Sequence, residues 1–178
     1  MHKAFATGIL AIGIAGTNAS ATDSPPGAVP ATAELSRAAF ERLKALDGDW
    51  EGKSTKGWEE TLQYRTIAGG TTVLETSFDA HPGQEMATAF YLDGDRLMLT
   101  HYCMAKNAPR LEATSFAEGG KTVVFTFVDG ANIPTRDRGH MDKAVIRFEG
   151  PDRITSRWTW YENGNEKWFE EIVQTRRR

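Results

Sequence analysis

The chain has little cysteine, no long basic run and no long hydrophobic segment, and each shortage excludes a class of protein. Its 178 residues include one Cys, which excludes an intrachain disulfide and any zinc finger built on cysteines. Lys and Arg number 21 against 24 Asp and Glu, so nothing predicts a nucleic-acid partner. The apolar stretch at residues 4–16 is shorter than the roughly 20 residues of a transmembrane helix. We therefore expect no membrane span.

The common catalytic signatures are also missing. The chain has no Gly-x-Ser-x-Gly, no Walker phosphate loop, no Gly-x-Gly-x-x-Gly after a strand and no His-Glu-x-x-His. Adjacent glutamates such as Glu59-Glu60 point to opposite faces of a strand and cannot act as a carboxylate dyad. We assign no catalytic residue, no metal ligand and no cofactor from the sequence.

The N-terminus predicts export. A short basic start at Met1-His2-Lys3 precedes the apolar stretch, and Ala19-Ser20-Ala21 supplies the small residues of a cleavage site. We expect a signal peptide over residues 1–21, a proline-rich linker over 22–32 that forms no structure, and one domain over 33–178. The mature protein is then periplasmic or secreted.

The remaining chain begins with a helical pattern. Apolar Leu35, Ala39, Leu43 and Leu46 recur at helical spacing after residue 33, with charged residues on the other face. Thr32 is a suitable N-cap residue. We expect one amphipathic helix of three to four turns, ending near residue 47.

After Gly48 the apolar period changes from 3.6 to 2 and remains so to the end. Turn pairs such as Gly69-Gly70, Asp93-Gly94 and Asn163-Gly164 separate runs rich in β-branched and aromatic residues. About ten evenly spaced strands predict an all-β, up-and-down antiparallel β-barrel. The segment 129–140 interrupts the rhythm, and both a loop at the barrel mouth and a crossing of its base remain open.

Strand alternation predicts which side chains face inward. A two-residue turn at Asp93-Gly94 pairs Phe90 with Leu97 and places His101 on the core face. The same alternation directs His140, Trp158 and Trp160 inward. A turn at Gly69-Gly70 pairs Tyr64 with Glu75, and periodicity leaves their side open.

Several inward polar residues indicate a cavity that holds water or a ligand, because a small barrel filled with Leu and Val needs none. Each of these residues can also be an ordinary core residue. The candidate ligand-binding residues are His101, His140, Trp158, Trp160, Arg110, Tyr64 and Glu75.

The order of four motifs resembles a known family. Gly48-Asp49-Trp50 after a short helix is similar to the Gly-x-Trp motif of the lipocalins and other calycins. Residues 93–103, 107–111, 139–141 and 158–161 are similar to a bacterial lipocalin-like group of unknown function, over roughly residues 40–175. The resemblance implies a calycin barrel with Arg176 laid over Trp50 as a cation–π lid. A solvated basic tail at residues 176–178 is the alternative.

Two function classes remain open. The first is an exported protein that binds a small, partly apolar molecule, in an unknown oligomeric state. The second, less favoured, is a calycin-like isomerase or hydrolase with His101 as general base. Haem binding is a subclass of the first, by resemblance to the nitrobindin barrels. Those barrels carry their iron-binding His late in the chain, whereas this chain has no His after His140.

Overall fold

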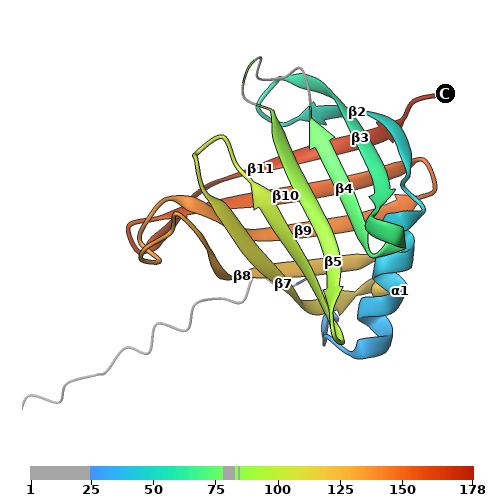
Figure 1. The fold of residues 1–178 in the computed structure, drawn as a ribbon, viewed down its shortest axis with the longest axis horizontal. Coiled ribbons are helices and arrows are strands. Elements are labelled where there is room, and N and C mark those ends of the chain that lie inside the picture. The colour runs from blue at the N-terminus through green and yellow to red at the C-terminus, as the bar shows by residue number, and fades with distance from the viewer. Residues whose placement is uncertain (1–24, 78–82, 84) are drawn as a thin grey trace, which may run out of the picture.

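The computed structural model describes residues 25–77, 83 and 85–178, and it shows a closed antiparallel β-barrel with one α-helix (Figure 1). The proposed signal peptide lies outside the described residues. The elements are β1 Val29–Pro30, α1 Ala33–Lys44, β2 Gly48–Ser54, β3 Glu59–Ile67, β4 Thr72–Ser77, β5 Met86–Asp93, β6 Arg96–Tyr102, β7 Ala108–Ala117, β8 Thr122–Ala131, β9 His140–Gly150, β10 Arg153–Glu162 and β11 Asn165–Arg176. Short 3₁₀ turns at Ala68–Gly70 and Glu118–Gly120 join β3 to β4 and β7 to β8.

Each strand from β2 to β11 pairs with its neighbour in sequence, and the pairing of β2 with β11 closes the barrel. The predicted fold class of about ten up-and-down strands with a preceding helix is therefore confirmed. The short strand β1 pairs with β7 through Val29 and Phe116. The expectation that residues 22–32 form no structure is wrong for this pair of residues, because β7 offers them a strand edge.

Helix α1 begins as predicted, since Thr32 caps it by accepting a hydrogen bond from the Leu35 backbone N–H at 3.2 Å. It ends at Lys44, three residues before the predicted end near residue 47. The helix lies across one end of the barrel (Figure 1), where Phe40 and Leu43 are buried. No helix among the described residues is long and apolar enough to cross a membrane.

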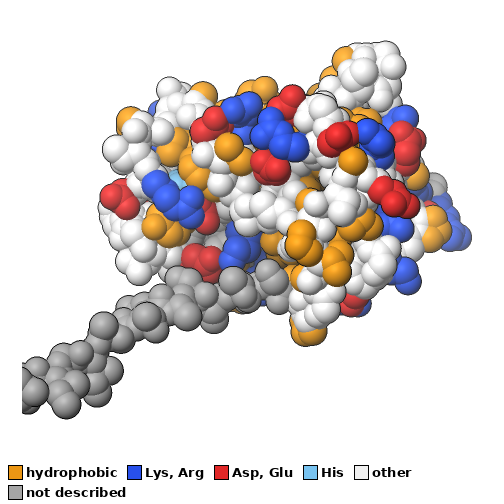
Figure 2. Space-filling model, turned by 90° about the horizontal axis from the view of Figure 1, so that it is seen from below, with side chains coloured by type: hydrophobic (Ala, Val, Ile, Leu, Met, Phe, Trp, Pro, Cys, Tyr) orange, Lys and Arg blue, Asp and Glu red, His pale blue; other side chains and the backbone are white. Residues whose placement is uncertain are grey.

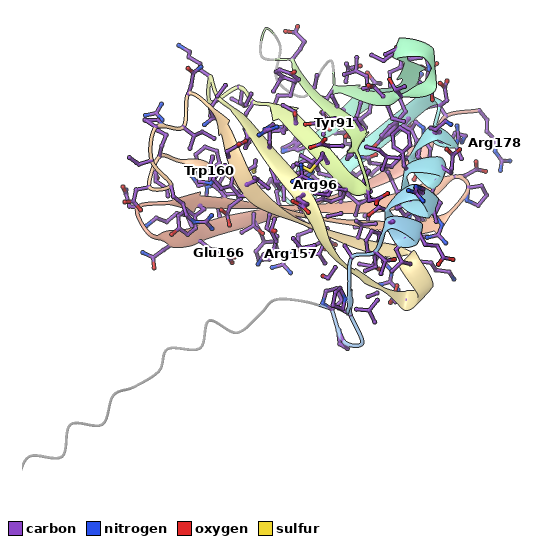
Figure 3. The ribbon with its side chains drawn as sticks, turned by 60° about the horizontal axis from the view of Figure 1, so that its bottom comes forward. Tyr91, Arg96, Arg157, Trp160, Glu166 and Arg178 are labelled. Atoms are coloured by element: carbon purple, nitrogen blue, oxygen red, sulfur yellow. The ribbon has the colours of Figure 1, made fainter. Side chains whose placement is uncertain are left out.

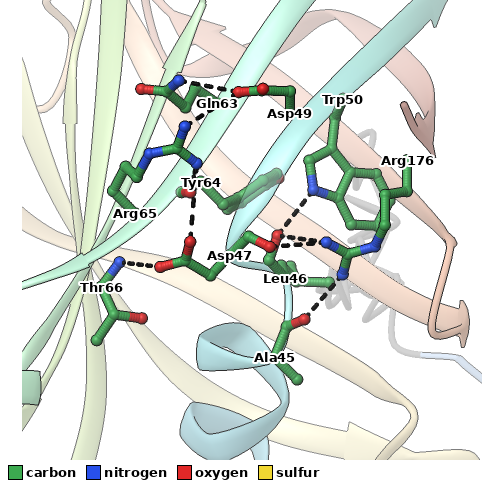
Figure 4. A network of polar contacts seen from close by, with 10 residues as sticks. All are labelled: Ala45, Leu46, Asp47, Asp49, Trp50, Gln63, Tyr64, Arg65, Thr66 and Arg176. Atoms are coloured by element: carbon green, nitrogen blue, oxygen red, sulfur yellow. Dashed lines mark hydrogen bonds and ion pairs between the residues drawn. The ribbon is translucent and has the colours of Figure 1, made fainter. Parts of the chain in front are cut away.

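The predicted lid over Trp50 is present at the same end (Figure 4). The Arg176 guanidinium lies 4.6 Å from the centre of the Trp50 ring. It also donates to the carbonyl oxygens of Ala45 at 2.8 Å and Asp47 at 2.7 Å, just after α1. The indole of Trp50, which is fully buried, donates to the Leu46 carbonyl oxygen at 2.8 Å. One arginine therefore joins the last strand, the first barrel strand and the helix.

Two local irregularities change what alternation predicted. The β5–β6 turn places Gly94 and Asp95 in the loop, so Phe90 pairs with Leu99 and not with Leu97. This shift of two positions keeps His101 on the core face. In β9 a bulge occurs where Trp160 pairs with Met141 and Thr159 with Lys143, which leaves one extra residue between them.

Figure 2 shows acidic and basic side chains interspersed over the face seen from below, with apolar side chains between them. Ion pairs such as Arg37 with Asp95 and Arg96 with Asp93 are well exposed to solvent. Exposed pairs contribute about 0–1 kcal/mol each. The free energy of folding therefore comes mainly from the barrel core.

Candidate functional site

A cleft of about 60 Å³ lies in the barrel interior at the end away from α1. One water needs about 10–15 Å³ of such space, so the cleft has room for several waters or a small polar group. Half of the lining side chains are apolar and half are polar. They are Trp58, Glu60, Leu62, Glu75, Ser77, Met86, Thr88, His101, Met141, Trp158, Glu170 and Ile172.

A row of polar side chains runs across four neighbouring strands into this cleft. Tyr64 of β3 pairs with Glu75 of β4, as predicted from the turn between them. Glu75 pairs with Thr88 of β5, and Thr88 pairs with His101 of β6. Directly paired residues share one face of a sheet, so the whole row faces the barrel interior. The question of which side Tyr64 and Glu75 face is thereby resolved.

His101 is the most distinctive member of the row. Its ring is 7% exposed, its Nδ1 lies 3.0 Å from the Thr88 hydroxyl, and its Nε2 has no hydrogen-bond partner among the described residues. Burial lowers the pKa of His101 to about 4, so the imidazole is neutral at neutral pH. A buried polar atom without a partner is an exception in folded proteins, and here it belongs to a side chain that lines the cleft.

Glu75 carries the opposite perturbation. Burial raises its pKa to about 7, although hydrogen bonds from Gln174 and Tyr64 favour the ionised form. Gln174 of β11 donates to the Glu75 carboxyl at 3.1 Å and accepts from the Tyr64 hydroxyl at 2.6 Å. Burial also holds the pKa of Tyr64 well above its usual value, so the phenol keeps its proton. The cleft thus holds a neutral imidazole and a carboxyl that changes charge near neutral pH.

The opposite wall of the cleft is aromatic and apolar. The Trp158 ring lies 4.9 Å from that of His101, tilted by 38°. Met141 of β9 and Met86 of β5 also line the cleft, and these flexible thioethers adapt to irregular shapes. His101 and Trp158 therefore approach each other from β6 and β10 as the inward-facing prediction required.

His140 does not line the cleft, contrary to the sequence-based expectation. The β9 bulge pairs it with Tyr161, and Met141 lines the cleft in its place. Its Nδ1 lies 2.5 Å from the Arg138 carbonyl oxygen and its Nε2 3.3 Å from Asp142, and the ring is fully buried. Each ring nitrogen lies within hydrogen-bond distance of an oxygen acceptor, so His140 is a structural residue that joins the preceding loop to β9.

Trp160 and Arg110 also lie outside the cleft lining. Trp160 lies at the barrel end away from α1 (Figure 3) and stacks on Trp168, with the ring centres 5.6 Å apart. Arg110 faces the surface and pairs with Asp129, its Nε donating at 2.6 Å. Arg110, a candidate ligand-binding residue from the sequence, therefore does not line the cleft, because Leu111 and Ala113 occupy the core side of β7.

Sequence reasoning missed several residues of the cleft. Thr88 lines the cleft, and Gln174, which bonds to Glu75, is buried next to that lining residue. Thr88 lies two residues from Phe90 and Gln174 two residues from Ile172, so strand alternation predicts that both face inward. Glu60 was not among the candidate residues, yet it is 6% exposed and lines the cleft. Glu170 also lines the cleft and accepts from the Ser54 hydroxyl at 2.5 Å.

The cleft does not fit a haem group. A volume of about 60 Å³ is far too small for a porphyrin, and none of the described lining residues is a Lys or Arg that pairs with propionates. Within the described residues, no group of three His, Cys, Asp or Glu side chains is arranged to hold a metal ion.

Comparison with known proteins adds no family to this description. No family model matches the chain, and no curated protein matches it either. The barrel shape is compatible with a calycin.

Proposed function

We propose that this protein binds a small, partly apolar molecule in the open end of its barrel. Trp58, Trp158 and the two methionines of the cleft contact the apolar part, and His101 and Glu75 contact the polar part. Small-molecule sites commonly combine an apolar lining with a few convergent polar groups, often at the mouth of a β-barrel.

One observation carries the proposal: the Nε2 atom of His101 is buried beside a cleft without a partner among the described residues. Leaving such a group unsatisfied costs about 1–3 kcal/mol. An unsatisfied nitrogen destabilises the core and gives the fold nothing in return. A bound molecule that forms a hydrogen bond with Nε2 removes this penalty.

The signal-like N-terminus and the family resemblance extend the proposal. Residues 1–21 support export, which makes this a periplasmic or secreted binding protein. The Trp50–Arg176 contact is the feature that the calycin resemblance implied, and it supports membership in that group of barrels.

A catalytic function is the second candidate, and it is favoured by one observation. With a pKa of about 7, Glu75 is matched to proton transfer at neutral pH, whereas His101, with a pKa of about 4, is a weak base. If the protein is an isomerase or hydrolase, Glu75 and not His101 is its proton-transfer group. Glu75→Gln would then abolish turnover.

Native mass spectrometry of the protein purified from its own source tests binding. We expect a reproducible added mass on the wild-type chain, and loss of most of it in His101→Phe, which keeps a ring but removes Nε2. The control is Arg110→Gln, on the barrel exterior, which should keep the added mass. A clean apo mass for both the wild type and the control would contradict the proposal.

A further inference from the structure

We infer that the molecule bound in the cleft is a small organic cation, a protonated amine whose N–H groups donate to Glu75 and to His101 Nε2. This inference names the ligand class of the site and therefore rests on the proposed binding function. It follows from the charge, the hydrogen-bonding state and the aromatic content of the cleft.

The charged groups of the cleft are all acidic. Three carboxyl side chains line it, those of Glu60, Glu75 and Glu170, and none of the described lining residues is Lys or Arg. The nearby Lys56 lies outside the lining, with its ammonium 4.5 Å from the Trp168 ring centre. An anion entering this cleft meets like charges, whereas a cation meets opposite ones.

The unpartnered nitrogen of His101 fits a donor. If Nδ1–H donates to the Thr88 hydroxyl oxygen, 3.0 Å away, Nε2 carries a lone pair and accepts a hydrogen bond. An ammonium group has donors only, so it can satisfy Nε2 and a carboxylate oxygen at once. A carboxylate ligand has no proton to donate to Nε2.

The aromatic rings of the cleft suit the same ligand. Trp158 lines it beside His101, and Trp58 lines it beside Glu60. The face of an indole attracts cations and also packs against alkyl groups. Both the charged and the apolar part of an alkylamine thus find suitable neighbours.

A matched set of probes tests the ligand class: n-butylamine, butan-1-ol and butanoate, which share a chain and differ in charge. Their dissociation constants are measured by NMR titration of the full chain at pH 8, following the side-chain signals of His101 and Trp158. We expect butylamine to bind about tenfold more tightly than butanol, the equivalent of one added charge-assisted hydrogen bond, and butanoate more weakly than both.

Variants identify the groups that make the selection. Glu75→Gln keeps the shape of the side chain, and we expect it to bind butylamine and butanol equally. Glu166→Gln removes an exposed carboxylate that pairs with Lys143 on the barrel exterior, and it should keep the wild-type preference. Butyltrimethylammonium, which has no N–H, should bind less tightly than butylamine because it cannot donate to His101.

The affinity for butylamine should also depend on pH. The titratable groups that line the cleft around Glu75 are Glu60, Glu170 and His101, and Tyr64 bonds to it from β3. His101 is already neutral above pH 6, and Tyr64 stays protonated. With a Glu75 pKa of about 7, its ionised fraction rises about tenfold between pH 6 and pH 8, and the affinity should rise by the same factor.

The outcomes separate this inference from the binding proposal. If butanol or butanoate binds in the cleft at least as tightly as butylamine, the inference of a cationic ligand is wrong, but the proposal of a binding site stands. Failure of all three probes to shift His101 or Trp158, together with a clean apo mass of the purified protein, overturns both. Equal affinity of Glu75→Gln and wild type for butylamine overturns the role given to that carboxyl.

Discussion

Replacing Glu75 should make the free energy of unfolding rise more steeply with pH, and replacing His101 should make it fall. The ordinary pKa values are 4.5 for Glu and 6.5 for His, against about 7 and about 4 in the fold. Between pH 4.5 and 6.5 the folded protein holds one proton on Glu75 and none on His101. The unfolded chain holds none on Glu75 and one on His101. The two groups together therefore bind the same number of protons in both states.

The magnitude follows from proton linkage, in which one proton of difference changes the free energy of unfolding by about 1.4 kcal/mol per pH unit. In Glu75→Gln only His101 remains, and the unfolded state binds the extra proton, so stability rises with pH. In His101→Asn only Glu75 remains, and the folded state binds the extra proton, so stability falls with pH. The two variants should diverge by about 2.7 kcal/mol per pH unit inside this window.

Urea unfolding followed by tryptophan fluorescence at pH 4.5, 5.5 and 6.5 measures these slopes. Other titrating groups contribute equally to all chains and cancel when each variant is compared with the wild type. Glu166→Gln, which changes an exposed carboxylate, should follow the wild-type profile. Parallel pH profiles for the wild type and both variants would refute the opposite shifts of the two pKa values.

Three further substitutions test the fold around the site, each by urea unfolding. Arg176→Met should lower the free energy of unfolding by about 2–3 kcal/mol, since it removes the cation–π contact and several hydrogen bonds. The control Arg178→Met, at an exposed residue, should change it little. Equal effects of the two substitutions would contradict the role of Arg176 as a lid over Trp50. His140→Phe should lower the free energy of unfolding by about 1–3 kcal/mol and leave unchanged the added mass seen by native mass spectrometry. Loss of that added mass would show that His140 belongs to the binding site. Gly130→Ala should lower the free energy of unfolding by about 1–3 kcal/mol, because the added Cβ would lie 2.7 Å from the Ala108 carbonyl oxygen. Gly150→Ala places its Cβ in open space and should have nearly the stability of the wild type.

Regular alternation made much of the barrel predictable. Phe90, Leu99 and His101 lie on uninterrupted stretches of β5 and β6. The turn between these strands shifts their pairing by two positions, and an even shift leaves His101 facing inward. The pairing of Tyr64 with Glu75 follows directly from the position of the turn between their strands. Arg176 could be placed over Trp50 only through the family resemblance, because periodicity does not relate the ends of a barrel.

The errors occur where tertiary structure overrides local pattern. A bulge in β9 exchanges His140 for Met141, and the residues of the bulge itself, Met141 to Lys143, include no glycine or proline to mark it. Val29–Pro30 reads as linker but pairs with β7, a contact between residues distant in sequence. The buried carboxyl of Glu60 was missed because a charged residue is normally expected at the surface.

A high-resolution crystal structure of the protein purified from its own source, without added ligand, tests the central claim most directly. The account predicts non-water electron density in the cleft, with an atom 2.7–3.2 Å from His101 Nε2 and further atoms against Trp158. A cleft that holds only ordered water, or that is filled by its own side chains, would contradict it.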